Sequence, residues 1–243
     1  MATNREYRAI LAVDIERSAG RGDEALRKIR DVLRIALRES VERSEIDWDA
    51  CGQRDSGDGI WLVLPAGVRK IQLLHPLAYE LAARLHAHNR MARPLAEVRV
   101  RLALHAGDIS LGPAGEPYGR PFEVTARMLD APSVKSALAE SPASLAVVIS
   151  QHFYDDTVPH GYPGIEPESF RRVSITVKEY EEDAWLYLPH GGIPEPPAAD
   201  REDRPETSER VPGRSVQINK AKDSGAVYAT QHGSQHIYVN GSD

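Results

Sequence analysis

Two stretches decide the fold, residues 7–15 (YRAILAVDI) and residues 54–64 (RDSGDGIWLVL). In each, an apolar run typical of a buried strand adjoins an acidic residue, Asp14 in the first and Asp58 in the second. Two carboxylates delivered by neighbouring strands supply hard oxygen ligands for Mg²⁺ and leave room for water and phosphate oxygens. The pair therefore indicates a metal site that serves chemistry on a nucleoside triphosphate.

Each carboxylate also has a purely structural interpretation. Asp14 precedes a helical pattern and could cap that helix through its side chain. Asp58 falls in the turn of an expected hairpin, where acidic residues are common. Either residue alone favours the structural interpretation, whereas the two together with the motifs downstream favour the metal site.

Hydrophobic periodicity predicts the other elements of the domain. Helical spacing predicts long amphipathic helices at residues 22–43 and 71–91, and alternation predicts a strand at residues 98–106. Residues 47–53 and 59–64 flank the RDSGD turn and predict a hairpin. The remaining elements are short, namely helices at residues 122–129 and after Pro132, a strand at 145–149, and an antiparallel pair at 173–178 and 184–188. The order βαββαβ, followed by further helices and strands, predicts an α+β domain with a mixed sheet and helices on one face.

The character of the sequence changes after Pro189. Residues 190–214 are rich in proline and alternating charges without periodicity, which predicts a linker. Residues 215–243 return to β-like alternation, which favours either a short β-rich tail or an unstructured one. We therefore expect a domain at residues 1–189, a linker at 190–214 and a tail at 215–243.

Composition narrows the class of protein. The chain has 243 residues, 41% hydrophobic and 27% charged, which is typical of a globular domain. Its net charge of −6 argues against general nucleic-acid binding. No apolar run approaches the roughly 20 residues that span a bilayer, so no membrane association is expected. A single cysteine, Cys51, and a start without the pattern of a signal peptide predict a cytoplasmic protein.

Several residues that could form sites have simpler structural interpretations. His86 and His88 are two residues apart on an expected helix and do not share a face, so they do not predict a metal site. His105 lies on an alternating strand and is interpreted as structural. Cys51 is expected within a strand, where it packs in the core.

Five motifs occur in order along the chain, and together they carry a resemblance. They are DI at residues 14–15, SGDG at 56–59, LALHAG at 102–107, YGRPFEVTARM at 118–128 and VSITVKEYEEDAWLYL at 173–188. They are similar to the DIxG, GDG, IGIHxG, YGxxVNxAxRL and terminal lysine-bearing elements of class III nucleotidyl cyclase catalytic domains. Residues 5–189 thus resemble that family, which implies a ferredoxin-like palm core and a head-to-tail homodimer with active sites at the interface.

The resemblance implies a metal and phosphate site. Asp14, the backbone of Ile15 and Asp58 would hold Mg²⁺ or Mn²⁺. The turn that follows would cradle phosphates, and it consists of Glu16, Arg17, Ser18 and Ala19. Arg127 would stabilise charge that develops on the phosphate, and Lys178 would bind the phosphate tail.

The resemblance also assigns the positions that contact the base and the ribose. Arg54 and Glu116 stand at the two base-selecting positions and keep a basic and acidic pair with longer side chains. A shallower pocket would suit a pyrimidine, although Arg54 and Glu116 could also pair and block it. Glu123 replaces an asparagine that donates to the ribose oxygen, and an ionised carboxylate has no donor. The first loop departs too, since Glu16, Arg17 and Ser18 replace a glycine and an aromatic residue.

The resemblance thus leads to two main functional hypotheses. The first is an enzyme that converts a nucleoside triphosphate, with a pyrimidine nucleotide as one option, into a 3′,5′-cyclic nucleotide and pyrophosphate by two-metal catalysis. The isolated catalytic domain resembles stand-alone cyclases of bacterial antiviral signalling. The alternative is a catalytically degenerate nucleotide-binding or scaffolding module that recruits an effector or partner protein through residues 215–243. A palm domain of another nucleotidyl-transferring family is a third option.

Overall fold

The computed structural model describes residues 5–113, 115–177 and 180–189. Lys178, the predicted linker at residues 190–214 and the predicted tail at residues 215–243 lie outside the described residues. None of the described helices combines the length and the apolar character that crossing a lipid bilayer requires.

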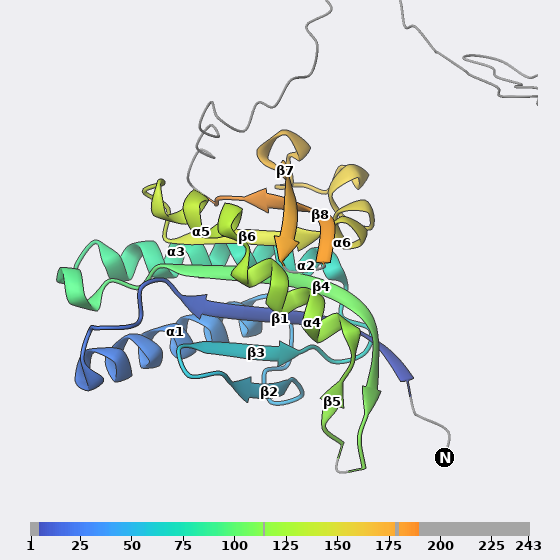
Figure 1. Cartoon of the computed structure of the whole chain (residues 1–243), viewed down its shortest axis with the longest axis horizontal. Helices are drawn as coiled ribbons and strands as arrows, with labels where there is room; N and C mark the ends of the chain where they lie inside the picture. The colour runs from blue at the N-terminus through green and yellow to red at the C-terminus, as the bar shows by residue number, and fades with distance from the viewer. Residues whose placement is uncertain (1–4, 114, 178–179, 190–243) are drawn as a thin grey trace, which may run out of the picture. The chain divides into compact units, whose positions relative to one another are not determined.

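A single mixed sheet forms the centre of the domain (Figure 1). The central strand β1 (Arg5–Ile15) pairs antiparallel with β3 (Gly59–Val63) on one side and with β4 (Val100–Leu111) on the other. The order along the sheet is β2-β3-β1-β4-β6-β8-β7, and the short strand β5 pairs with β4. The other strands are β2 (Gly52–Asp55), β5 (Pro117–Tyr118), β6 (Leu145–Ser150), β7 (Arg171–Val177) and β8 (Tyr180–Tyr187). The order β2-β3-β1-β4 is that of a ferredoxin-like core, and the parallel pairing of β4 with β6 makes the sheet mixed, which confirms the predicted α+β fold class.

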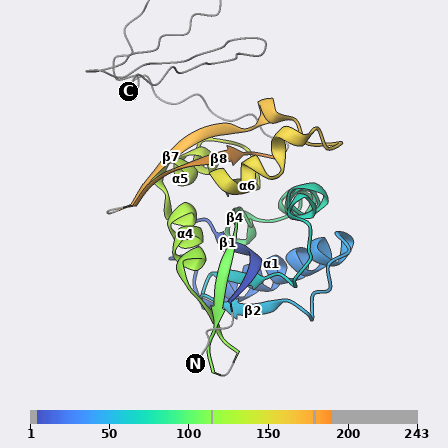
Figure 2. The same cartoon turned by 90° about the vertical axis from the view of Figure 1, so that its right-hand side faces the viewer.

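Helices cover both faces of this sheet. The helices α1 (Asp23–Arg43) and α3 (Tyr79–Asn89) pack on the face to which Leu11 and Val13 of β1 point. The helices α4 (Arg120–Asp130) and α5 (Pro132–Ala139) pack on the opposite face with Ala12. Figure 2 shows α4 and α1 on opposite sides of β1 and β4. The two helices of the palm core thus share one face. The predicted helices at residues 122–129 and after Pro132 form as α4 and α5, but they lie on the opposite face, so the expectation of helices on one face holds for the palm core alone. The remaining helical segments are α2 (Lys70–Gln72), η1 (Leu73–Ala78), η2 (Pro94–Ala96), α6 (Gln151–Asp155), η3 (Val158–His160) and η4 (Pro167–Ser169).

The predicted continuous helix at residues 71–91 is wrong. The backbone of His75 is extended, with φ −140° and ψ 118°, and the regular helix α3 begins only at Tyr79. The cause is Pro76, since a proline ring disfavours the helical conformation of the residue before it.

The first strand of the hairpin begins later than predicted. Asp47 turns the chain, because its Oδ1 accepts a hydrogen bond of 2.9 Å from the backbone amide of Asp49. The amide of Cys51 donates to the carbonyl of Trp48 at 3.2 Å, so β2 starts only at Gly52. Cys51 therefore precedes the strand, but its side chain is buried in the core as expected, and burial raises the pKa of its thiol to about 11.

His105 joins β4 to the start of α6. Its Nδ1 lies 2.8 Å from the hydroxyl of Ser150, and that hydroxyl caps α6 by accepting from the amide of Phe153. Burial is the main cause that lowers the pKa of His105 to about 4, and the nearby His152 adds to it. At neutral pH the folded protein therefore contains His105 in its neutral form, in contact with Ser150.

The stability of the protein is expected to depend on His105 in acid. Because the histidine pKa is 6.5 when unperturbed and about 4 here, the unfolded chain binds a proton that the folded chain does not. The stability contributed by the neutral ring is therefore lost as the pH falls from 6.5 towards 4. In urea unfolding, the free energy of unfolding of wild type should fall by about 2–3 kcal/mol more than that of His105→Gln between pH 7 and pH 4.5. His86→Gln, at an exposed site on α3, is the matched control, and equal losses in wild type and His105→Gln would contradict the prediction.

Candidate functional site

Two carboxylates meet where β1 ends. Asp14 pairs in register with Gly59 of β3, and Asp58 lies in the turn just before that strand. The backbone amide of Ile15 donates to the carbonyl of Asp58 at 3.2 Å, which ties the turn to β1. Burial is the main cause that raises the pKa of Asp14, and the negative charge of Asp58 also raises it. The fold thus brings the three predicted metal-binding residues together.

The structure excludes one of the two interpretations of Asp14. Asp14 lies within β1, whereas α1 begins at Asp23 after Gly22, and no side chain caps it. The interpretation of Asp14 as a helix cap is therefore wrong. Asp58 does lie in the hairpin turn, and this turn places it beside Asp14.

Arg101 of β4 is a site residue that the sequence analysis missed. Its Nε donates to Oδ1 of Asp14 at 2.8 Å, and its Nη2 donates to Oδ2 at 2.6 Å. The side chains of Arg101 and Asp14 are only 13% and 16% exposed, so this forked ion pair is strong and orients the carboxylate. The ion pair lowers the pKa of Asp14, which opposes the rise that burial causes. The available signal was a pair of arginines at alternate positions of an otherwise apolar strand, VRVRLALHA.

The predicted phosphate loop is held by contacts within its own chain. Glu16 is buried, and its carboxylate lies 3.5 Å from Nη1 of Arg99 instead of pointing to solvent. The guanidinium of Arg21 donates to the carbonyl of Glu16 at 3.0 Å. Arg17 adopts a left-handed backbone with φ 51°, a conformation that favours glycine. These contacts fix the course of the loop despite its unusual residues.

Two further residues complete the loop. The hydroxyl of Ser18 donates to Oδ2 of Asp58, so this residue touches one of the two carboxylates. Ala19 is exposed beside it. Ser18 thereby orients Asp58 as Arg101 orients Asp14.

A separate cavity of about 830 Å³ lies between the β2–β3 hairpin and α4. Arg54, Glu116 and Glu123, the predicted base and ribose positions, all line it. Trp61 and Phe122 form an aromatic wall, with ring centroids 6.1 Å apart and planes inclined by 31°. The sequence analysis missed these two aromatic residues, although Trp61 pairs in register with Arg54.

The predicted metal-binding residues and the residues that line the cavity form two separate groups. Among the described residues, the lining of the cavity includes neither Asp14 nor Asp58. Arg54 makes no hydrogen bond or ion pair with another described residue, so the alternative in which Arg54 and Glu116 pair across the pocket is not seen here. Arg127 lies in the last turn of α4, and Lys178 falls outside the described residues.

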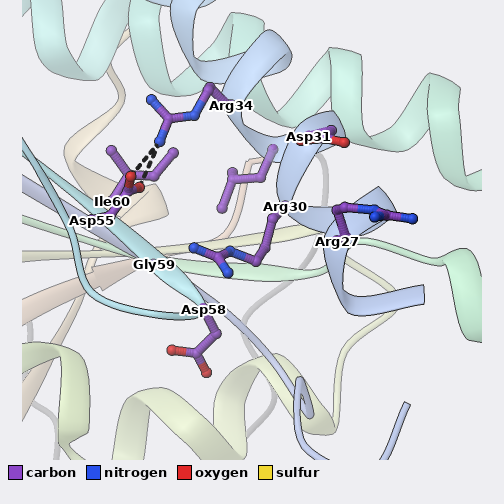
Figure 3. Close-up of a pocket in the computed structure, with 9 residues that line it drawn as sticks. Arg27, Arg30, Asp31, Arg34, Asp55, Asp58, Gly59 and Ile60 are labelled. Atoms are coloured by element: carbon purple, nitrogen blue, oxygen red, sulfur yellow. Dashed lines mark hydrogen bonds and ion pairs between the residues drawn. The ribbon is translucent and has the colours of Figure 1, made fainter. Parts of the chain in front are cut away.

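The hairpin is anchored to α1 from its other side. Nη2 of Arg34 donates to both carboxylate oxygens of Asp55, at 2.6 and 2.7 Å, beside a hollow of about 150 Å³. Figure 3 shows the guanidinium of Arg30 between α1 and the turn, with the carboxylate of Asp58 pointing away from the arginines. The ion pair between Arg34 and Asp55 therefore positions the hairpin without engaging Asp58.

The end of β1 carries oxygen atoms of the kind that Mg²⁺ and Mn²⁺ accept, namely carboxylate and carbonyl oxygens of Asp14, Asp58 and Ile15. Arg101 already donates to both carboxylate oxygens of Asp14, so a cation there would share this carboxylate with a guanidinium. No cluster of three or more His, Cys, Asp or Glu side chains suited to a metal occurs in the described part of the chain.

Gly59 controls how closely the turn approaches Asp14. A Cβ built on Gly59 would meet the carbonyl oxygen of Val13, and it would lie 3.3 Å from the Cα of Asp14. Because these are backbone atoms, they yield poorly, so Gly59→Ala is expected to lower the free energy of unfolding by about 1–3 kcal/mol in urea. Gly52→Ala is the control, since its Cβ would make an ordinary contact of 3.4 Å with Val63. Equal stability of the two variants would contradict the prediction.

Comparisons with known proteins complete the description. No family model matches the sequence, and no curated protein matches it either. Solved structures do match. The guanylyl cyclase Cya2 is 16% identical with a TM-score of 0.54, over 82% of this chain and 98% of that one. An adenylate/guanylate cyclase/hydrolase from Silicibacter pomeroyi is 18% identical with a TM-score of 0.57, over 77% of this chain and 99% of that one. A bacterial light-regulated adenylyl cyclase is 11% identical with a TM-score of 0.53, over 76% and 52%. This chain therefore has the palm fold of adenylate and guanylate cyclase catalytic domains.

Proposed function

We propose that this protein is a nucleotidyl cyclase that converts a nucleoside triphosphate into a 3′,5′-cyclic nucleotide and pyrophosphate. The observation that carries the proposal is the convergence of Asp14 and Asp58 at the end of β1, on a fold shared with cyclase catalytic domains. The cavity that joins Arg54, Glu116 and Glu123 adds a place for the base and the ribose.

The proposed reaction is an internal displacement at phosphorus. The 3′-oxygen of the ribose loses its proton and bonds to the α-phosphorus, while the bond from that phosphorus to the bridging oxygen breaks and pyrophosphate leaves. Arg127 and Lys178 are proposed to offset negative charge on the phosphates. Bound by Asp14, Ile15 and Asp58, Mg²⁺ or Mn²⁺ would supply Lewis acidity and neutralise charge. Arg101 and Ser18 orient the two carboxylates for this purpose.

The proposed assembly is a head-to-tail homodimer. Within one chain, the cavity lining contains neither of the two carboxylates, as far as the described residues go. An active site that combines both groups would therefore join the Asp14 and Asp58 of one protomer to the cavity of its partner. This arrangement agrees with the resemblance of the sequence to a family whose sites lie at the interface.

The identity of the base is proposed from two residues that line the cavity, Arg54 and Glu116. A volume of about 830 Å³ admits a purine or a pyrimidine, so selection depends on how far Arg54 and Glu116 reach. The long side chain of Arg54 favours a pyrimidine nucleotide. We further propose that the product is a bacterial signal, such as one used in antiviral defence in the cytoplasm, and that residues 215–243 contact an effector protein.

A second function is favoured by one observation in the cavity. Glu123 lines it and presents a carboxylate, which cannot donate a hydrogen bond to a ribose oxygen when ionised. A module that binds a nucleotide without cyclising it, and that recruits a partner, would tolerate this residue.

Turnover tests the two functions directly. The protein is incubated with ATP, GTP, CTP or UTP in Mg²⁺ and in Mn²⁺, and cyclic monophosphates are measured by mass spectrometry. Wild type should form one cyclic product. Asp14→Asn and Asp58→Asn should each lower its rate by about 100-fold or more, since each removes a carboxylate that is proposed to bind the metal. Asp49→Asn, at an exposed site before the hairpin, is the control. No product, with a melting temperature that still rises on adding a triphosphate, would favour the binding module.

Base selection is tested by shortening both side chains. The double variant Arg54→Lys with Glu116→Asp should increase the ratio of kcat/KM for ATP over that for CTP by about tenfold or more, because the pocket becomes deeper. Glu140→Asp, at an exposed position that does not line the cavity, is the control for shortening a side chain. An unchanged ratio would count against selection by these two residues.

A further inference from the structure

The turn between β4 and β5 brings Glu116 back over Gly112. The amide of Gly112 donates to the carbonyl of Glu116 at 2.9 Å, and the amide of Gly115 donates to the carbonyl of Gly112 at 3.0 Å. These bonds close a tight turn at the rim of the cavity, and Glu116 leaves the turn as a member of the cavity lining.

The carboxylate of Glu116 occupies the space that a side chain at position 112 would need. A Cβ built on Gly112 would lie 2.8 Å from Oε2 of Glu116 and closer still to Oε1 and the carboxyl carbon. Real Cβ atoms do not make such contacts, so a side chain at position 112 and this position of the carboxylate exclude one another.

Backbone strain does not explain the glycine at position 112. Gly115 in the same turn has φ +82°, in the region that favours glycine, and a Cβ there would have open space around it. Gly112 is outside that region of φ, so its backbone accepts an alanine. A side chain at position 112 would therefore displace the flexible end of Glu116 and leave the backbone in place.

Glu116 shares the cavity with a residue of opposite charge. Arg54 lines the same cavity and makes no ion pair with another described residue. With the carboxylate folded over Gly112, the guanidinium of Arg54 has its donors available for a ligand. A carboxylate displaced from Gly112 would be able to form an ion pair with Arg54, which lines the same cavity. This ion pair would lie across the cavity.

We propose that Gly112 is a positioning residue that, by lacking a side chain, leaves room for the Glu116 carboxylate against the turn and so keeps the cavity open. The ligand class is a planar heterocycle, which would stack on Trp61 and Phe122 while Arg54 donates to its acceptor atoms. The proposal rests on the proposed function only for the identity of that heterocycle as a nucleobase.

A double-mutant cycle isolates this role. Gly112→Ala, Glu116→Ala and the double variant are compared for binding of 3′-deoxynucleoside triphosphates, which lack the attacking hydroxyl, by calorimetry. Gly112→Ala should weaken binding by about tenfold or more with little change in melting temperature. In the Glu116→Ala background the same substitution should change the dissociation constant less than about twofold, because the carboxylate to be displaced is absent.

Two results would overturn the proposal. An equal loss of binding on adding Gly112→Ala to wild type and to Glu116→Ala would assign Gly112 to the turn alone. No loss in either background would mean that the carboxylate does not control the cavity.

A second readout needs no ligand and separates this proposal from the proposed function. Phenylglyoxal modifies accessible arginines, and peptide mass spectrometry measures the rate at Arg54, with the exposed Arg27 of α1 as internal reference. Gly112→Ala should slow modification of Arg54 by at least about threefold, and Glu116→Ala should restore it. If wild type binds no triphosphate, the proposed function fails, and this rate still tests Gly112; an unchanged rate would refute the role.

Discussion

The pairing register of the central strand β1 is the constraint on which the site depends. Asp14 stands opposite Gly59 on one neighbour and opposite Arg101 on the other. A slip of one residue would turn Asp14 to the other face of the sheet, away from its partners. Packing on both faces opposes this slip, because Leu11 and Val13 are buried against the helices of one face and the smaller Ala12 is buried on the other. Hydrophobic packing therefore fixes the orientation of a polar side chain.

The periodicities of the sequence predicted the α+β class because they are strong and local, whereas the palm core was implied by the resemblance of its five motifs. The strand that carries Asp14 and the hairpin turn that carries Asp58 follow from apolar runs broken by acidic residues. Two element boundaries were wrong for reasons that are also local: Pro76 interrupts a helical pattern, and Asp47 turns the chain before β2. Periodicity measures burial over several residues, and so it does not register the effect of a single residue of this kind.

The parts of the site that escaped prediction depend on contacts between distant segments. Arg101 is 87 residues from Asp14 in the chain, and only the register of β1 with β4 makes them neighbours. Glu16 departs from the motif that the first loop resembles, yet it is buried beside Arg99. A buried carboxylate is costly without a partner, so Arg99 makes this unusual loop sequence compatible with the fold. The roles of Arg127, Lys178 and the C-terminal tail stay predictions.

The β2–β3 hairpin has a mechanical consequence. One strand of it carries Arg54 into the cavity, its turn carries Asp58 to the end of β1, and Arg34 clamps it to α1 through Asp55. Any movement of the hairpin would therefore shift Arg54 and Asp58 together, so that a ligand which displaced Arg54 in the cavity would also displace one of the two carboxylates.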